Sequence, residues 1–185
     1  VNDPRNDYYQ TYTVDYLQNV AGGPPVVYLN VPSQEMKNIT QKLLEDGLPV
    51  WMGCDVGKQM HRERGLWDAK LFDFEELYGA EFGMDKANRL RYSQTMMTHA
   101  MLFTGVDVID GAPRRWRVEN SWGAKKSGEE GFYTMNDSWY DEHMFEIAAP
   151  TDYLTEKMKK GLSTTPVVLP AWDPMGSLAK DEAAL

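Results

Sequence analysis

Residues 98–123, THAMLFTGVDVIDGAPRRWRVENSWG, constrain the fold more than any other stretch of the chain. The apolar run 101–103 and the valines that follow predict a β-strand buried along most of its length. Asp110 and Gly111 form a hairpin turn signal, and Pro113 is expected to keep the return path from pairing too early. Alternating apolar and charged residues over 116–120 then predict a half-buried second strand.

Antiparallel pairing of these strands brings His99 and Asn120 to the same end of the hairpin. An amide oxygen there can hold one ring nitrogen and leave the other free to take a proton. This is two thirds of a Cys-His-Asn site, in which the imidazole ionises a thiol and the Asn orients the imidazole. Trp122 is expected on the same face, where it would shield the pair from water. A purely structural strand histidine is the other interpretation of His99, and the Asn-Ser-Trp-Gly run favours the catalytic one.

Six stretches of the sequence resemble the papain-like cysteine peptidases, and within them the bleomycin hydrolases and bacterial aminopeptidases C. The stretches are NDPRNDYY at 2–9, GLPVWMGCDVGK at 47–58, MTHAM at 97–101, WRVENSWG at 116–123, GFYTM at 131–135 and LPAWDPMGSLAK at 169–180. Glu119 fits this branch, whereas Phe103 is bulkier than the small aliphatic residue common at its position.

The resemblance implies an α+β fold of the papain type. We expect a twisted, mostly antiparallel half-barrel that carries the His and the Asn, with helices 33–46 and 151–161 packed outside. The implied activity is that of a cysteine aminopeptidase hydrolysing peptide or amide bonds. His99 would act as general base, Asn120 would orient it, and Trp122 would support the pair.

The nucleophile that such an enzyme needs is not evident in this chain. Its single cysteine, Cys54, follows a strand-like segment that runs into a glycine turn, with no helix start and no upstream Gln pattern. We expect a buried or cleft-wall thiol there. The sequence is therefore interpreted as the C-terminal part of a larger enzyme, inactive without its Cys-bearing N-terminal half. The alternative is a non-catalytic fragment or pseudo-peptidase that serves as a scaffold or interaction module.

Residues 163–185 are expected to form an extended tail, separate from a domain at 1–162, because prolines interrupt helices and sheet ladders. The tail could lie on its own domain with Val168, Leu169 and Trp172 in grooves. The resemblance implies instead that the tail enters the cleft and gates it for aminopeptidase action. The residues implied are Gly176, Ser177, Leu178, Ala179 and Lys180. The chain continues through 181–185, so these last residues are trimmed, turn out of the cleft or change the gating; the sequence leaves all three open.

Elsewhere the patterns predict a small number of regular elements. Ser33 is expected to cap a helix that ends at Gly47, with an apolar stripe along one side. A further helix should span 85–97, beginning at Asp85, and residues 58–83 should form a long irregular excursion. The stripe consists of Met36, Ile39, Leu43 and Leu44, and the remaining elements are strands at 26–31, 49–56, 132–135 and 145–149 and a helical turn at 136–143. Residues 1–25 are a possible interface segment whose tyrosines pack on a neighbouring element.

The composition of the chain limits the kinds of partner and compartment that we expect for it. One cysteine excludes a disulfide framework and suits a reducing, cytoplasmic compartment. A net charge of -9 argues against nucleic-acid binding, and no apolar run reaches the roughly 18 residues of a membrane span. His143, near Glu142 and Glu146, lacks metal-ligand spacing, so neither metal nor cofactor is expected. We expect a peptide or amide substrate, the missing half and, by resemblance, a homo-oligomer such as a hexamer.

Overall fold

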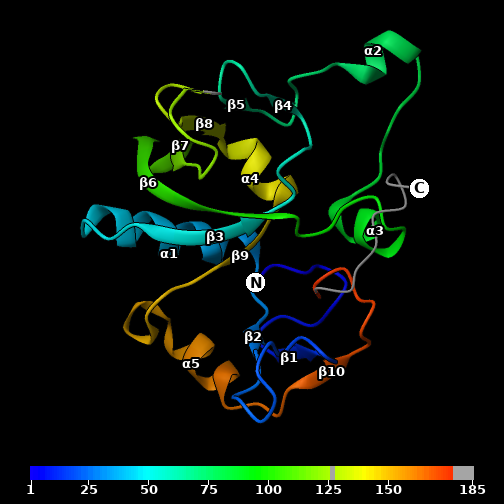
Figure 1. The fold of residues 1–185 in the computed structure, drawn as a ribbon, viewed down its shortest axis with the longest axis vertical. Helices are drawn as coiled ribbons and strands as arrows, with labels where there is room; N and C mark the ends of the chain where they lie inside the picture. The colour runs from blue at the N-terminus through cyan, green and yellow to red at the C-terminus, as the bar shows by residue number, and fades with distance from the viewer. Residues whose placement is uncertain (126–127, 177–185) are drawn as a thin grey trace.

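The computed structural model describes residues 1–125 and 128–176, which form two β-sheets with helices packed around them (Figure 1). The larger sheet has the order β4-β5-β8-β7-β6-β3-β9, and the smaller has the order β10-β1-β2. The strands are β1 (Thr11–Val14), β2 (Tyr28–Leu29), β3 (Val50–Cys54), β4 (Met60–His61), β5 (Leu66–Trp67), β6 (His99–Ile109), β7 (Ala112–Glu119), β8 (Phe132–Asn136), β9 (Met144–Ile147) and β10 (Val167–Leu169). The helices are α1 (Ser33–Glu45), α2 (Phe74–Tyr78), α3 (Lys86–Arg91), α4 (Asp137–His143), η1 (Thr151–Tyr153) and α5 (Glu156–Leu162).

The hairpin predicted from the sequence is the centre of the larger sheet. Asp110 and Gly111 have φ angles of 52° and 79°, the left-handed conformation that a tight two-residue turn requires. The expected burial of β6 is wrong beyond Phe103, because β3 pairs with β6 only from His99 to Phe103 and the tip of the hairpin extends past it. The expectation that Pro113 keeps the returning strand from pairing at that point is also wrong, since Pro113 already pairs with Val108.

Helix α1 supplies the predicted apolar stripe to the core. Met36, Ile39 and Leu43 are buried in the main hydrophobic cluster, and Gly47 follows the helix with a φ of 78°. Ser33 is the first helical residue and not the cap, which is Pro32, and the Ser33 hydroxyl donates to Asp141 at 2.7 Å. The pattern also missed Lys37, which is buried on α1 and pairs with two aspartates of α4.

Aromatic side chains join α4 to the hairpin. The Tyr140 ring lies 5.6 Å from Phe103 of β6 and 5.1 Å from Trp116 of β7, centroid to centroid. The hydroxyl groups of Tyr140 and Thr40 are 3.2 Å apart, so α1 and α4 meet over the same part of the sheet. The architecture is therefore α+β, with a curled, open sheet, and it confirms the predicted fold class. The sheet is mixed, because β5 runs parallel to β8.

The excursion at 58–83 and the later helices are more structured than the sequence indicates. The excursion contains β4, β5 and α2, and α2 projects away from the rest of the chain in Figure 1. Helix α3 ends at Arg91, earlier than expected. The helix expected over 151–161 is two elements, η1 and α5, because Thr155 caps a new helix by accepting from the Met158 amide at 3.3 Å.

The tail pairs with the beginning of the chain. Strand β10 runs parallel to β1, which the sequence did not predict, and its three residues fit between Pro166 and Pro170. The expectation that these prolines exclude a sheet ladder is therefore wrong for the residues between them. Val168 and Trp172 are 64% and 75% exposed, so neither occupies a groove of the described chain. The separation of domain and tail at 162/163 stays a prediction.

Candidate active site

The structure brings His99 and Asn120 together at one end of the hairpin. Imidazole Nε2 lies 3.0 Å from Oδ1 of Asn120. Because an amide oxygen only accepts hydrogen bonds, Nε2 carries the proton and Nδ1 keeps a free lone pair. The predicted proximity is confirmed, and the arrangement can accept a proton at Nδ1 while the ring is held in one orientation.

Trp122 flanks this pair. Its ring centroid is 5.1 Å from that of His99, with an interplanar angle of 31°, and its edge-to-face neighbour is Tyr133 at 6.1 Å. Asn120 is buried, whereas His99 is partly exposed. The indole therefore packs beside an imidazole that solvent or substrate can still reach.

Neighbouring backbone segments position the two residues. The amide of Thr98 donates to the Cys54 carbonyl at 3.0 Å, which ties the start of β6 to the end of β3. The Asn120 amide donates to the Gly131 carbonyl at 3.0 Å, which fixes the end of β7 against the start of β8. Both ends of the pair are thus anchored to flanking strands of the sheet.

Cys54 is the direct partner of His99 in the antiparallel pairing of β3 and β6. Its side chain is fully buried. Burial, followed by the negative charge of Asp55, raises the pKa of the Cys54 thiol well above its usual value. A protonated, inaccessible thiol is a poor nucleophile.

No group of three or more His, Cys, Asp or Glu side chains among residues 1–125 and 128–176 could hold a metal ion. His143 is buried on α4 beside the Trp139 ring, 5.0 Å away. Helices of the length and apolarity needed to cross a membrane do not occur in the described part of the chain.

Two hollows occur elsewhere in the described part of the chain. One of about 420 Å³ is lined by α1, β9, α5 and the β2 region, and another of about 500 Å³ lies over β7 and β8. Neither lining includes His99, Asn120 or Trp122, so neither hollow is the candidate site.

Sequence reasoning missed one neighbour of the site and could not place most of the gating residues. Arg62 lies over the Trp122 ring, although the sequence shows only a charged run at 61–64. Gly176 lies against Val14 of β1, and its amide donates to the Asp173 carbonyl at 2.8 Å. The gating prediction for Ser177, Leu178, Ala179 and Lys180 falls outside the described residues.

The hairpin and its flanking strands form the curled half-barrel of a papain-like fold, with the His-Asn pair at one end of the hairpin. Consistent with this class, a family model described as Peptidase C1-like family matches residues 1–176. The chain therefore belongs to the Peptidase C1-like family.

The curated relatives include proteins named aminopeptidase C and bleomycin hydrolase. Aminopeptidase C of Listeria innocua is 41% identical over 97% of this chain and 41% of its own length. Bleomycin hydrolase of Homo sapiens is 43% identical over 97% of this chain and 41% of its own length. The solved structure of PepW from Lactobacillus rhamnosis HN001 superposes with a TM-score of 0.91 at 39% identity, covering 96% of this chain and 40% of that one. The chain thus spans about two fifths of the length of the relatives it matches.

Proposed function

We propose that this chain supplies the general base and its orienting residue to a cysteine aminopeptidase of the bleomycin-hydrolase type. The observation that carries the proposal is the 3.0 Å contact between His99 Nε2 and Asn120 Oδ1, which leaves Nδ1 available as a base. Membership of the Peptidase C1-like family and relatives named aminopeptidase C and bleomycin hydrolase support the reaction class. The substrates would be peptides or small amides.

In the proposed mechanism, His99 Nδ1 takes the proton of a cysteine thiol, and the thiolate attacks the carbonyl carbon of the scissile amide. The resulting imidazolium gives this proton to the leaving amine, which departs and leaves a thioester. His99 then takes a proton from water as the oxygen attacks the thioester, the C–S bond breaks to release the carboxylic acid, and the imidazolium returns its proton to the cysteine sulfur. Asn120 holds the ring in place through all steps, and Trp122 keeps competing water from their hydrogen bond.

The nucleophile is proposed to come from a segment outside these 185 residues. Cys54, the single cysteine, is buried and its pKa is raised, so it does not suit the role. The partly exposed imidazole of His99 fits one wall of a cleft whose other wall comes from a segment outside these 185 residues. The same buried thiol favours the second candidate function, a non-catalytic scaffold, if no other cysteine is brought to His99.

We further propose that residues 176–180 gate the cleft for aminopeptidase action. The support is the position of the segment that precedes them. Arg5 bridges Asp3 and Asp173 at 2.6 and 2.8 Å, and β10 pairs with β1, so the tail is held to the chain up to Gly176.

Association with further protein is also proposed, with a homo-oligomer such as a hexamer as the complete assembly. The segment around α2 exposes large apolar side chains on a projecting arm (Figure 1), as expected of a surface that contacts another element or subunit. These side chains are Phe72, Phe74, Leu77, Tyr78, Phe82 and Met84. A cytoplasmic location is proposed from the sparing use of cysteine.

The experiment is a hydrolysis assay on aminoacyl amides with the protein at its full natural length. His99→Ala should lower kcat by about 10²-fold or more, because it removes the general base. Asn120→Ala should lower kcat about 2- to 10-fold, because it removes one hydrogen bond that orients the imidazole. His61→Ala, in β4, is the matched control and should change little. Unimpaired turnover by His99→Ala would refute the proposal, and absence of turnover in the wild type would favour the scaffold.

A further inference from the structure

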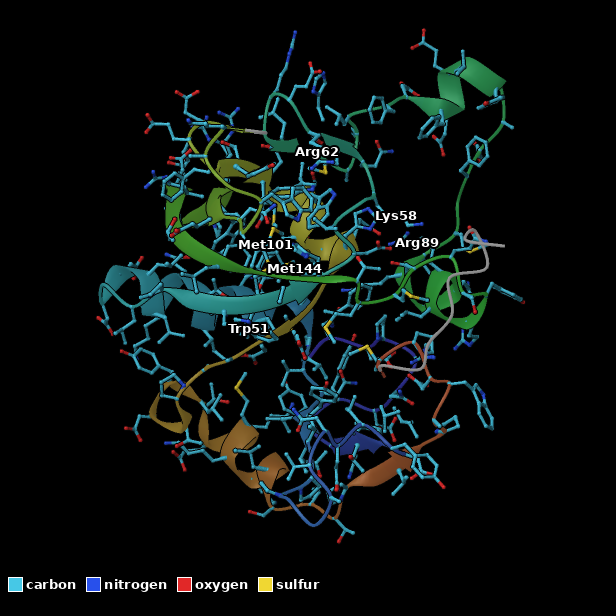
Figure 2. All side chains as sticks on the ribbon, in the orientation of Figure 1. Trp51, Lys58, Arg62, Arg89, Met101 and Met144 are labelled. Atoms are coloured by element: carbon cyan, nitrogen blue, oxygen red, sulfur yellow. The ribbon has the colours of Figure 1, made fainter. Side chains whose placement is uncertain are left out.

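Arg62 contacts the indole that packs beside the His99 imidazole. Its Cζ lies 4.8 Å from the centroid of the Trp122 ring, and Figure 2 labels it on the segment between β4 and β5. The same ring is 5.1 Å from the His99 imidazole. Trp122 therefore contacts both the guanidinium of Arg62 and the imidazole of His99.

The backbone that carries Arg62 is fixed relative to Trp122. The Arg62 carbonyl accepts hydrogen bonds from the amides of Gly65 at 3.2 Å and Gly128 at 3.3 Å. In turn the Gly65 carbonyl accepts from the Thr134 amide at 2.8 Å, which ties this turn to β8. Tyr133, a further neighbour of the indole, lies on β8 as well. The backbone of Arg62 is thus tied to β8, the strand whose Tyr133 packs against the edge of the indole.

The charge of Arg62 is not paired with any carboxylate of residues 1–125 or 128–176. None of the ion pairs within residues 1–125 and 128–176 includes Arg62, although its neighbourhood in the sequence is rich in charge. Its side chain is exposed, so the contact with the indole is a cation–π interaction at the surface. Such a contact is worth a factor of about 2 to 5 in an equilibrium constant.

We propose that Arg62 is a positioning residue that holds Trp122 closed over the hydrogen bond between His99 and Asn120. When the indole moves away, water competes for Nε2–H, and the imidazole is free to turn from the orientation in which Nδ1 faces a thiol. Arg62 reduces the population of this open state. The catalytic meaning of the contact rests on the proposed function, whereas the closure itself does not require any activity.

The exchange rate of the His99 Nε2 proton with water measures this closure directly. It can be followed by NMR in ¹⁵N-histidine-labelled protein of full natural length, with His99→Ala identifying the signal. Arg62→Gln should raise the exchange rate about 2- to 5-fold. Arg62→Lys keeps a cation and should therefore recover part of the protection. The recovery should be incomplete, because an ammonium group cannot stack flat on the indole as a guanidinium does. Arg64→Gln, two residues away and also exposed, is the control and should leave the rate unchanged.

A double-mutant cycle shows whether Arg62 acts through the indole. In a Trp122→Leu background, Arg62→Gln should add nothing further to the exchange rate. Equal exchange rates of the His99 Nε2 proton in Arg62→Gln and wild type would overturn the proposal. So would an increase in this rate on Arg62→Gln that is as large in the Trp122→Leu background as in wild type. A wild-type Nε2 proton that exchanges as fast as that of a free imidazole would overturn it as well. A parallel rise in backbone amide exchange along β6 would also overturn it, because that indicates general destabilisation. Failure of the wild type to hydrolyse amides would refute the proposed function alone.

Discussion

Cys54 and His99 are direct cross-strand partners of β3 and β6, so their side chains leave the same face of the sheet. Their roles nevertheless differ, since the thiol is fully buried and the imidazole is partly exposed. The neighbouring pairs on this face, Met52 with Met101 and Val50 with Phe103, are buried core residues. Cys54 therefore belongs to the end of the core, and His99 to the edge at which the core meets the surface.

Cys54→Ala should leave amide hydrolysis by the protein of full natural length within about twofold of wild type. The reason is that the raised pKa keeps this thiol protonated and its burial keeps it from substrate. Loss of the sulfur from a filled site should lower the free energy of unfolding by about 1 kcal/mol. Activity and urea unfolding measured on the same samples check both statements. Complete loss of hydrolysis with an intact fold would show that Cys54 is the nucleophile.

Arg5→Ala should destabilise the protein by about 3 kcal/mol, because it leaves the carboxylates of Asp3 and Asp173 buried without their cation. Arg114→Ala is the matched control. The Arg114 pair with Asp107 is about half exposed on both sides and should contribute less than about 1 kcal/mol. Urea unfolding of the two variants compares the pairs. Equal losses would contradict the account in which Arg5 holds the tail to the start of the chain.

Gly65→Ala and Gly79→Ala separate backbone strain from collision. Both glycines have a φ of +62°, so an added side chain costs about 1 kcal/mol of left-handed strain at either position. At Gly79 the new methyl group meets nothing within 4 Å, whereas at Gly65 it lies 2.6 Å from the Gly128 Cα. Gly65→Ala should therefore cost about 1–3 kcal/mol more than Gly79→Ala in urea unfolding. A difference near zero would mean that Gly65 does not lie in close contact with Gly128.

His143 should make the fold sensitive to acid. Burial lowers the pKa of its imidazole to about 3, and the positive charges of Arg89, Lys86 and Lys58 act in the same direction. Figure 2 labels Arg89 and Lys58 of this group. The unfolded chain takes up the proton near pH 6.5, whereas the folded protein does so only near pH 3. Acidification through this window therefore favours unfolding, and the stability present above pH 6.5 is lost at up to about 1.4 kcal/mol per pH unit.

The measurement is the free energy of unfolding between pH 7 and pH 4 for wild type and His143→Leu. The leucine variant should show a smaller slope, because it has no proton to take up. His61→Leu, in β4, should keep the wild-type slope. If His143→Leu and wild type lose stability in parallel, the acid sensitivity comes from other groups.

The elements that the sequence predicts well are those whose signals are local. The hairpin turn at Asp110 and the stripe on α1 depend on residues close together in the chain, and both occur as expected. The His-Asn contact was predictable because a single hairpin joins its partners. Pairing of β1 with β10 was not, because more than 150 residues separate these strands and each is short. The Arg62 contact depends likewise on the parallel pairing of β5 with β8, which local patterns do not specify.

The burial of charged side chains is the other feature that the sequence pattern does not predict. Apolar periodicity places Lys37 on the polar side of α1, but the two aspartates of α4 satisfy its ammonium group in the interior. The residue type of Ser33 favours a cap, yet no side chain caps α1, and the Ser33 hydroxyl donates instead to Asp141 of α4. In both cases a partner distant in sequence decided the outcome.

The central claim is that His99, held by Asn120, turns a cysteine outside this chain into a thiolate. The direct measurement is the rate at which iodoacetamide alkylates that cysteine at pH 5.5, in protein of full natural length carrying Cys54→Ala, with the modified residue located by peptide mapping. An ordinary thiol is almost fully protonated at this pH and reacts slowly. The account predicts alkylation about tenfold or more faster with His99 than with His99→Ala. Equal rates in the two proteins would contradict it.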